Sequence, residues 1–257
     1  STYSDLMFPA WALADGPDAF AARVADPATR QRMASEMLDI FPRQTGAEPS
    51  SIQFREVPER LDLQGQTLAD YLAEKDRPAT IPAAVDALIE LQLAGGFIGI
   101  FHGMSEADIE RVMGYPDAMF ETDGDLVTPG VGHPHPRSYG ALARVLGRYT
   151  REKGVLTLEE AVRRMTSVPA AWHGQAERGM LGEDMLADIV VFDEATIGSR
   201  ATYTDPHHYA DGVVHLLING ELVLRAGEVT NSMPGRFLDR GRRDSARTLG
   251  GQQQGEQ

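Results

Sequence analysis

The chain has 257 residues, of which 42% are hydrophobic, and its formal net charge is -14 at pH 7. This length can bury the core of one large domain or of two ordinary ones, and the acidic balance argues against nucleic acid as a partner, because phosphate binding needs concentrated Lys and Arg. No cysteine is present, so no disulfide can form, and no apolar run reaches the ~18 residues that a membrane-spanning helix needs.

Helical patterns dominate residues 14–94. Apolar side chains recur at helical spacing up to Leu38 and are interrupted at Asp26-Pro27, which predicts two short helices with a break between them. The pattern then predicts a loop at Phe41-Pro42, because proline is unfavourable inside a helix.

A strand and two further helices are predicted in the same stretch. Residues 52–57 alternate as a strand does. Thr67 is the predicted N-cap of the next helix. Residues 83–93 carry the apolar stripe of an amphipathic helix, which ends at Gly95-Gly96.

A strand–helix–strand pattern follows. Residues 97–101 form an uninterrupted apolar run, typical of a strand buried on both faces of a parallel sheet. A helix over residues 106–113 and a short strand over residues 118–120 would complete a βαβ unit. His102 and Asp123 lie near the ends of the two strands, so we expect both on one rim of an α/β barrel, the face that carries catalytic residues in such barrels. Local sequence alone leaves open that Asp123 merely belongs to a turn.

The C-terminal part alternates between helices and strands. One helix is predicted over residues 138–154, and Thr157 and Glu160 form a capping box that begins the next. Strands are predicted at 189–192, 213–218 and 221–224, with a hairpin turn at Asn219-Gly220 between the last two.

Four segments carry a resemblance to a known family: residues 104–113, Tyr115-Pro116, Thr122-Asp-Gly124 and His133-Pro-His-Pro-Arg137. In this order and spacing they resemble the C-terminal half of the N-acyl-D-amino-acid deacylases. These enzymes are the D-aminoacylase branch of the metal-dependent amidohydrolase superfamily, which residues 179–193 also resemble.

The resemblance implies an α/β fold: the C-terminal part of a TIM-like (β/α)8 barrel, with a small inserted α+β domain and part of a β-sandwich domain. Residues 1–13 would connect from the barrel, and residues 14–94 would form the inserted domain that borders the active site. Residues 95–178 would be the last barrel βα units, residues 179–239 strands of the small β domain, and residues 240–257 a disordered tail.

The resemblance also implies a reaction. A metal-activated water would hydrolyse the amide of a small N-acyl-D-amino acid, with Asp123 as the carboxylate that shuttles the proton and as a candidate metal ligand. Arg137 would hold the α-carboxylate of the substrate through its planar guanidinium, and His102 is a further candidate for substrate binding. The residues themselves leave open that Arg137 only pairs with an acidic side chain at the surface.

Zinc, as one or two ions, is the expected cofactor, bound mainly by residues outside this chain. His133 and His135 have the spacing of a zinc-binding pair, but prolines flank both in a loop, so we expect them to shape the loop that presents Arg137. His207-His208 is predicted to be structural or exposed. The family's metal ligands, a His-x-His strand, a Cys and two later His residues, have no counterpart set here.

An incomplete barrel would expose strand edges and apolar surface, so we expect the N-terminal half of the same protein, as a separate or missing polypeptide, to complete it. The start at Ser1 fits self-cleavage, another protease or truncation. A cytoplasmic location is also expected. Two alternatives stay open: another amidohydrolase, such as a cyclic amidase or a dipeptidase, and a non-catalytic subunit without the metal half.

Overall fold

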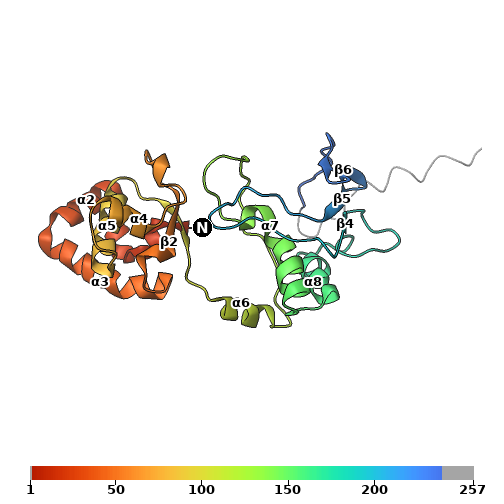
Figure 1. Cartoon of the computed structure of the whole chain (residues 1–257), viewed down its shortest axis with the longest axis horizontal. Coiled ribbons are helices and arrows are strands. Elements are labelled where there is room, and N and C mark those ends of the chain that lie inside the picture. The colour runs from red at the N-terminus through yellow and green to blue at the C-terminus, as the bar shows by residue number, and fades with distance from the viewer. Residues whose placement is uncertain (1, 239–257) are drawn as a thin grey trace, which may run out of the picture. The chain divides into compact units, whose positions relative to one another are not determined.

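The computed structural model describes residues 2–238, which divide into two compact units (Figure 1). The first unit consists of residues 2–109, Asp123–Tyr139 and Ala201–His208. The second unit consists of Glu110–Thr122, Gly140–Arg200 and residues 209–238. Each unit has its own cluster of buried apolar side chains. The predicted disordered tail lies outside the described residues, and the predicted domain boundaries stay a prediction.

Helices make up most of the first unit. Its α-helices are α1 (Ala10–Leu13), α2 (Pro17–Ala25), α3 (Pro27–Thr45), α4 (Leu68–Glu74) and α5 (Ile81–Leu93), and α6 (Glu106–Met113) leads from the first unit into the second. Short 3-10 helices are η1 (Ser4–Met7), η2 (Pro49–Ser51) and η3 (Leu61–Leu63). Helices α2 to α5 gather beside strand β2 (Ile52–Glu56) in Figure 1.

The break between α2 and α3 is confirmed. Asp26 caps α3 by accepting a hydrogen bond from the Thr29 N–H at 2.8 Å. The predicted loop at Phe41-Pro42 is wrong, because α3 continues through Pro42. The inner face of α3 carries three fully buried apolar side chains: Met33, Met37 and Phe41. Burial of each contributes roughly 1.5–3 kcal/mol, which offsets the cost of about 3 kcal/mol for a proline inside a helix.

The cap predicted for α4 is a reciprocal one. The Thr67 hydroxyl accepts a hydrogen bond from the Asp70 N–H at 3.2 Å, and the Asp70 carboxylate accepts one from the Thr67 N–H at 2.8 Å. Both free amides at the start of the helix are thereby satisfied. The predicted helix over residues 83–93 is confirmed as α5.

The first unit contains a three-stranded sheet. Its strands β1 (Thr2–Tyr3), β3 (Ile98–Phe101) and β2 lie in that order, and both pairs are antiparallel. The strands predicted at residues 52–57 and 97–101 are confirmed as β2 and β3, whereas β1 was not predicted and the parallel pairing expected for residues 97–101 is wrong. Within the described residues, β3 pairs with β1 and β2, and both of these strands run antiparallel to it.

Residues 118–120 do not form the predicted second strand of a βαβ unit. The Ala118 N–H bonds to the Tyr115 carbonyl in a turn, and the Phe120 N–H donates to the carbonyl of Arg164 on α8 (Leu158–Met165). A strand pairs its backbone groups with a neighbouring strand. Here the backbone N–H of Phe120 instead pairs with a carbonyl of a helix. The described residues form helices and two antiparallel sheets, and the expected barrel stays a prediction.

The second unit combines helices with a four-stranded sheet. Its helices are α7 (Arg137–Arg144), whose first residues belong to the first unit, the π-helix η4 (Val145–Glu152), α8 and α9 (Ser167–Trp172). The strands β4 (Ile189–Phe192), β5 (Val213–Ile218), β6 (Glu221–Arg225) and β7 (Glu228–Val229) form the antiparallel order β4-β5-β6-β7. The Asn219-Gly220 hairpin is confirmed, with φ of +50° and +85° as a tight hairpin turn requires.

The helix predicted over residues 138–154 is interrupted. It begins at Arg137, is distorted at Gly140, and continues as a π-helix from Val145. Gly147 in that widened part lies against the backbone of Ile197, where a Cβ atom would be only 2.6 Å from the carbonyl oxygen.

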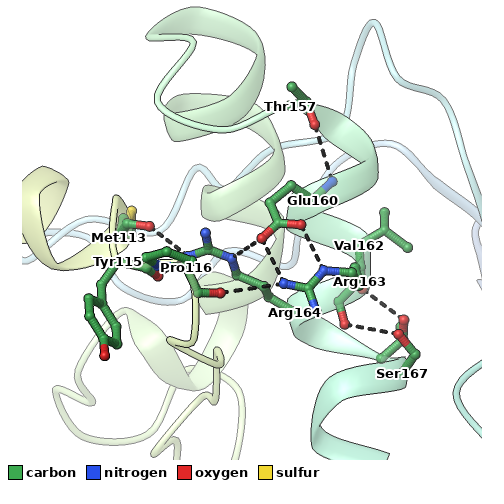
Figure 2. A network of polar contacts seen from close by, with 10 residues as sticks. Met113, Tyr115, Pro116, Thr157, Glu160, Val162, Arg163, Arg164 and Ser167 are labelled. Atoms are coloured by element: carbon green, nitrogen blue, oxygen red, sulfur yellow. Dashed lines mark hydrogen bonds and ion pairs between the residues drawn. The ribbon is translucent and has the colours of Figure 1, made fainter.

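A buried arginine ties α8 to the residues that follow α6 (Figure 2). The Arg164 side chain is 4% exposed. It donates to Glu160 on its own helix and to the carbonyls of Met113 and Tyr115, each at 2.7 Å. These contacts satisfy the buried guanidinium and two backbone carbonyls at the C-terminal end of α6.

Of the two hydrogen bonds of the capping box predicted at Thr157, the structure contains one. The Thr157 hydroxyl accepts from the Glu160 N–H at 3.2 Å. The Glu160 carboxylate instead accepts from Arg163 and Arg164, and these hydrogen bonds lower its pKa to about 2.

Candidate active site

Asp123 and Arg137 form an ion pair in the first unit, with 2.6 Å between Asp123 Oδ2 and Arg137 Nη2. The Asp123 side chain is 67% exposed, whereas the Arg137 side chain is 25% exposed. The two residues that sequence analysis selected for the reaction are thus direct neighbours. A guanidinium has five N–H donors, so the contact through Nη2 does not exhaust its capacity to bind a second carboxylate.

The backbone around Asp123 explains the Thr-Asp-Gly sequence. Asp123 has a φ of +42°, a left-handed conformation that Asp tolerates better than most residues. A Cβ atom on Gly124 would lie 3.0 Å from the Cα atom of Ser138. The Asp125 N–H donates to the Ser138 hydroxyl at 3.2 Å. The glycine therefore lets this segment lie directly against the first turn of α7, beside Arg137.

A second ion pair lies close along the same segment. Arg55 on β2 pairs with Asp125, and the Arg55 side chain is 20% exposed. Sequence analysis missed both residues. The strand pattern of residues 52–57 does not indicate that Arg55 pairs with a carboxylate 70 residues further along the chain. Two guanidinium groups thus meet carboxylates that are two residues apart.

Tyr203 lies between two of the histidines. Its ring centroid is 4.6 Å from that of His102 and 5.2 Å from that of His135, both in edge-to-face geometry. His135 Nδ1 accepts a hydrogen bond from the Arg137 N–H at 3.1 Å. This hydrogen bond fixes the backbone of the loop at Arg137, as expected for a histidine that shapes the loop. Sequence analysis did not select Tyr203.

The two histidines beside Tyr203 are held in their neutral form. Burial, aided by the positive charge of Arg137, lowers the pKa of His135 to about 3. Desolvation also lowers the pKa of His102. A neutral His135 can accept the hydrogen bond from the Arg137 backbone, whereas a protonated ring could not.

Gln53 of β2 connects three parts of this region. Its amide nitrogen donates to the carbonyls of Gly65 and Tyr203 at 2.9 Å and 2.8 Å, and its amide oxygen faces His102 Nε2 at 3.3 Å. His133 Nε2 donates to the same Tyr203 carbonyl at 2.7 Å and lies 3.3 Å from the Gln53 amide nitrogen. The residue is 4% exposed, and sequence analysis did not select it.

The remaining histidines have local partners. His207 Nδ1 accepts from the Gly130 N–H at 3.1 Å and Nε2 donates to the Gly132 carbonyl at 2.9 Å, which ties down the loop before His133. His208 pairs with Asp205 at 2.7 Å. These contacts agree with the structural role expected from the sequence.

A cavity of about 400 Å³ borders the Arg55 side chain within the first unit. The lining combines charged, polar and apolar groups: Arg55, Glu56, Leu61, Gln64, Val127, Val131, Gly132, His133 and Pro134. A pocket with apolar walls and a few polar groups suits a small molecule with one charged end.

The described residues do not form a metal centre by themselves. They contain no group of three or more His, Cys, Asp or Glu side chains that could hold a metal ion. A catalytic zinc site needs about three protein ligands, so these residues alone do not fit one. Likewise, no helix within residues 2–238 is long and apolar enough to cross a membrane.

Residues 101–224 match the model of the amidohydrolase family. An N-acyl-D-glutamate deacylase of Alcaligenes xylosoxydans xylosoxydans is 40% identical over 176 residues, 68% of this chain and 34% of that protein. A D-aminoacylase of the same organism is 37% identical over 70% of this chain and 35% of its own length.

Solved structures agree with these relatives. A D-aminoacylase crystal structure has a TM-score of 0.65 and 33% identity, over 74% of this chain and 38% of that one. An N-acyl-D-glutamate deacylase from Bordetella bronchiseptica, complexed with zinc and a phosphonate inhibitor, has a TM-score of 0.59 and 34% identity, over 70% of this chain and 37% of that one.

The chain therefore belongs to the amidohydrolase family. Within that class it is related to the N-acyl-D-amino-acid deacylases, as the motifs around Asp123 and Arg137 predicted. The chain spans about a third of the length of the curated relatives that it matches.

Proposed function

We propose that this chain is part of an enzyme that hydrolyses the amide bond of N-acyl-D-amino acids and releases a carboxylate and a free D-amino acid. The names of the relatives support the reaction class. The observation that carries the proposal is the 2.6 Å contact between Asp123 and Arg137.

The contact suits this substrate for a geometric reason. In an N-acyl amino acid, the α-carboxylate and the amide nitrogen are bonded to the same carbon atom. Groups that act on the two must therefore be neighbours. Arg137 would bind the α-carboxylate through parallel hydrogen bonds, which would bring the amide nitrogen to the Asp123 carboxylate.

Asp123 would act first as a base and then as an acid. It would take a proton from water as the water oxygen bonds to the amide carbon, and it would return this proton to the nitrogen as the C–N bond breaks. Because the Asp123 carboxylate is exposed, both the water and the amide nitrogen of the substrate could reach it. Because the described residues do not form a metal centre, the ligands of the zinc expected from the B. bronchiseptica relative would lie mainly outside this chain.

An acidic side chain on the substrate fits best. A substrate such as N-acyl-D-glutamate or N-acyl-D-aspartate has two carboxylates, and the segment from Asp123 to Asp125 is flanked by two guanidinium groups, those of Arg137 and Arg55. Arg55 also borders the 400 Å³ cavity, which would accept the side chain. The relatives include deacylases for N-acyl-D-glutamate and N-acyl-D-aspartate.

The test is a substrate panel with the full-length, zinc-loaded protein that contains these residues. N-acetyl-D-glutamate, N-acetyl-L-glutamate, N-acetyl-D-leucine and a cyclic amide would be compared, with the free amino acid resolved by chiral chromatography. We expect release of D-glutamate at the highest kcat/KM. Hydrolysis of the cyclic amide alone, or release of no D-amino acid, would refute the proposal.

A further inference from the structure

Gln53 makes more contacts to the candidate site than its place in a sheet requires. Its side chain is buried on β2, and it reaches the turn at Gly65, the loop that carries Tyr203, and His102 at the end of β3. Because these segments are far apart in the chain, one amide group ties them to the sheet.

The hydrogen-bond partners determine how the amide is oriented. The carbonyls of Gly65 and Tyr203 can only accept, so the NH2 group of Gln53 must face both of them. The amide oxygen then faces His102 Nε2. An oxygen can only accept, and therefore the proton of a neutral His102 ring lies on Nε2.

The network continues to the substrate-binding residue. The Tyr203 ring, whose carbonyl Gln53 holds, packs against both His102 and His135. His135 accepts the hydrogen bond from the Arg137 N–H, and the Arg137 guanidinium reaches Asp123. Each step of this path is a direct contact within the first unit.

We propose that Gln53 is a positioning residue of this site: its amide holds His102 as the Nε2–H tautomer and holds Tyr203 in the position from which His135 orients Arg137. A polar side chain that is 4% exposed contributes to stability only when its hydrogen bonds are made. The hydrogen-bond partners of Gln53 therefore select one arrangement of the turn at Gly65 and of the loop that carries Tyr203. The effect on catalysis, which rests on the proposed deacylase function, should concern substrate binding more than the chemical step.

Two variants separate the two contacts. Gln53→Met has a similar length and removes the hydrogen bonds to Gly65, Tyr203 and His102 together with the 3.3 Å contact to His133 Nε2. Gln53→Glu keeps an acceptor for His102 and loses both donors to the carbonyls. Gln66→Leu is the matched control, because Gln66 is exposed and its side-chain amide donates to the nearby Asp62 carbonyl at 2.8 Å.

The first measurement does not depend on activity. Long-range 1H–15N spectra of the histidine rings in the full-length protein should show the Nε2–H form of His102 in the wild type and in Gln66→Leu. Gln53→Met should lose that preference. A wild-type His102 with its proton on Nδ1 would overturn the proposal, whatever substrate the enzyme has.

The second measurement is the division of the effect between KM and kcat on the best N-acyl-D-amino acid. We expect KM to rise about tenfold in Gln53→Met and in Gln53→Glu, with kcat within about threefold of wild type, the size of one lost charge-assisted contact. Unchanged KM in both folded variants would refute the positioning role. An inactive wild type would refute the proposed function alone and would leave the spectroscopic test to decide.

Discussion

The Arg137 guanidinium lies 2.6 Å from the Asp123 carboxylate, where the Thr-Asp-Gly segment lies against the start of α7. Burial does not hold the Asp123 side chain, since it is mostly exposed. Their positions depend on backbone contacts: the close approach of Gly124 to Ser138 and the bond from the Arg137 N–H to His135.

Substitution of Asp123 tests its role as a proton carrier. We expect Asp123→Asn to lower kcat about 10²- to 10⁴-fold, because an amide cannot accept the proton from water, with little change in thermal stability. Glu121→Gln is the control, since it neutralises another exposed carboxylate in the same segment. A variant at position 123 that keeps more than a tenth of the wild-type kcat would contradict the assignment.

Removal of the Arg137 guanidinium should mainly weaken substrate binding. Arg137→Met is expected to raise KM roughly 10- to 100-fold, which corresponds to one charge-assisted hydrogen-bonding group, whereas Arg111→Met on α6 should not. Because Arg137 contacts Asp123, the double variant with Asp123→Asn should show non-additive effects on kcat/KM. Additive losses would indicate that the two residues act separately.

Arg55 should determine the preference for an acidic side chain. We expect Arg55→Leu to lower kcat/KM for N-acetyl-D-glutamate roughly 10- to 100-fold and to change the value for N-acetyl-D-leucine less than threefold. Arg60→Leu is a suitable control, because Arg60 also pairs with carboxylates in the first unit, those of Asp62 and Glu74. Equal losses on both substrates would show that Arg55 supports the fold and not selectivity.

Arg164 should matter for stability. Arg164→Met removes a buried guanidinium and leaves the carbonyls of Met113 and Tyr115 without their donor (Figure 2), which should cost about 3 kcal/mol in the free energy of unfolding. Arg163→Met, at an exposed neighbour that also binds Glu160, should have little effect. Chemical denaturation of the three proteins measures the difference, and equal stabilities would contradict this account.

The Glu160 carboxylate should make the stability of the protein depend on pH in the acidic range. Hydrogen bonds from Arg163 and Arg164 lower its pKa from 4.5 to about 2 in the folded protein. Below pH 4.5 the unfolded chain takes up a proton that the folded protein does not, so this stabilisation is complete above pH 4.5 and is lost as the pH falls towards 2. The difference in thermal midpoint between wild type and Glu160→Gln should therefore shrink over that range. A difference that stays constant from pH 6 to pH 2.5 would contradict the shift.

Local signals in the sequence determined most helices and hairpins. The cap at Thr67, the break at Asp26-Pro27 and the Asn219-Gly220 turn depend on interactions between residues a few positions apart, and such interactions can be read from a single chain. The motifs around Asp123 and Arg137 could also be recognised from the sequence, because the family resemblance depends on the order and spacing of these motifs along the chain.

Tertiary structure alone decided which distant groups meet. Residues 118–120 have the composition of a strand but bond to α8, and α3 continues through Pro42 because its buried face outweighs the cost of the proline. The pairing of Arg55 with Asp125, and the contacts that Gln53 makes with His102 and Tyr203, join segments that the sequence separates widely. The physical reason is that a hydrogen bond or an ion pair depends on distance in space, whereas a sequence pattern records only distance along the chain.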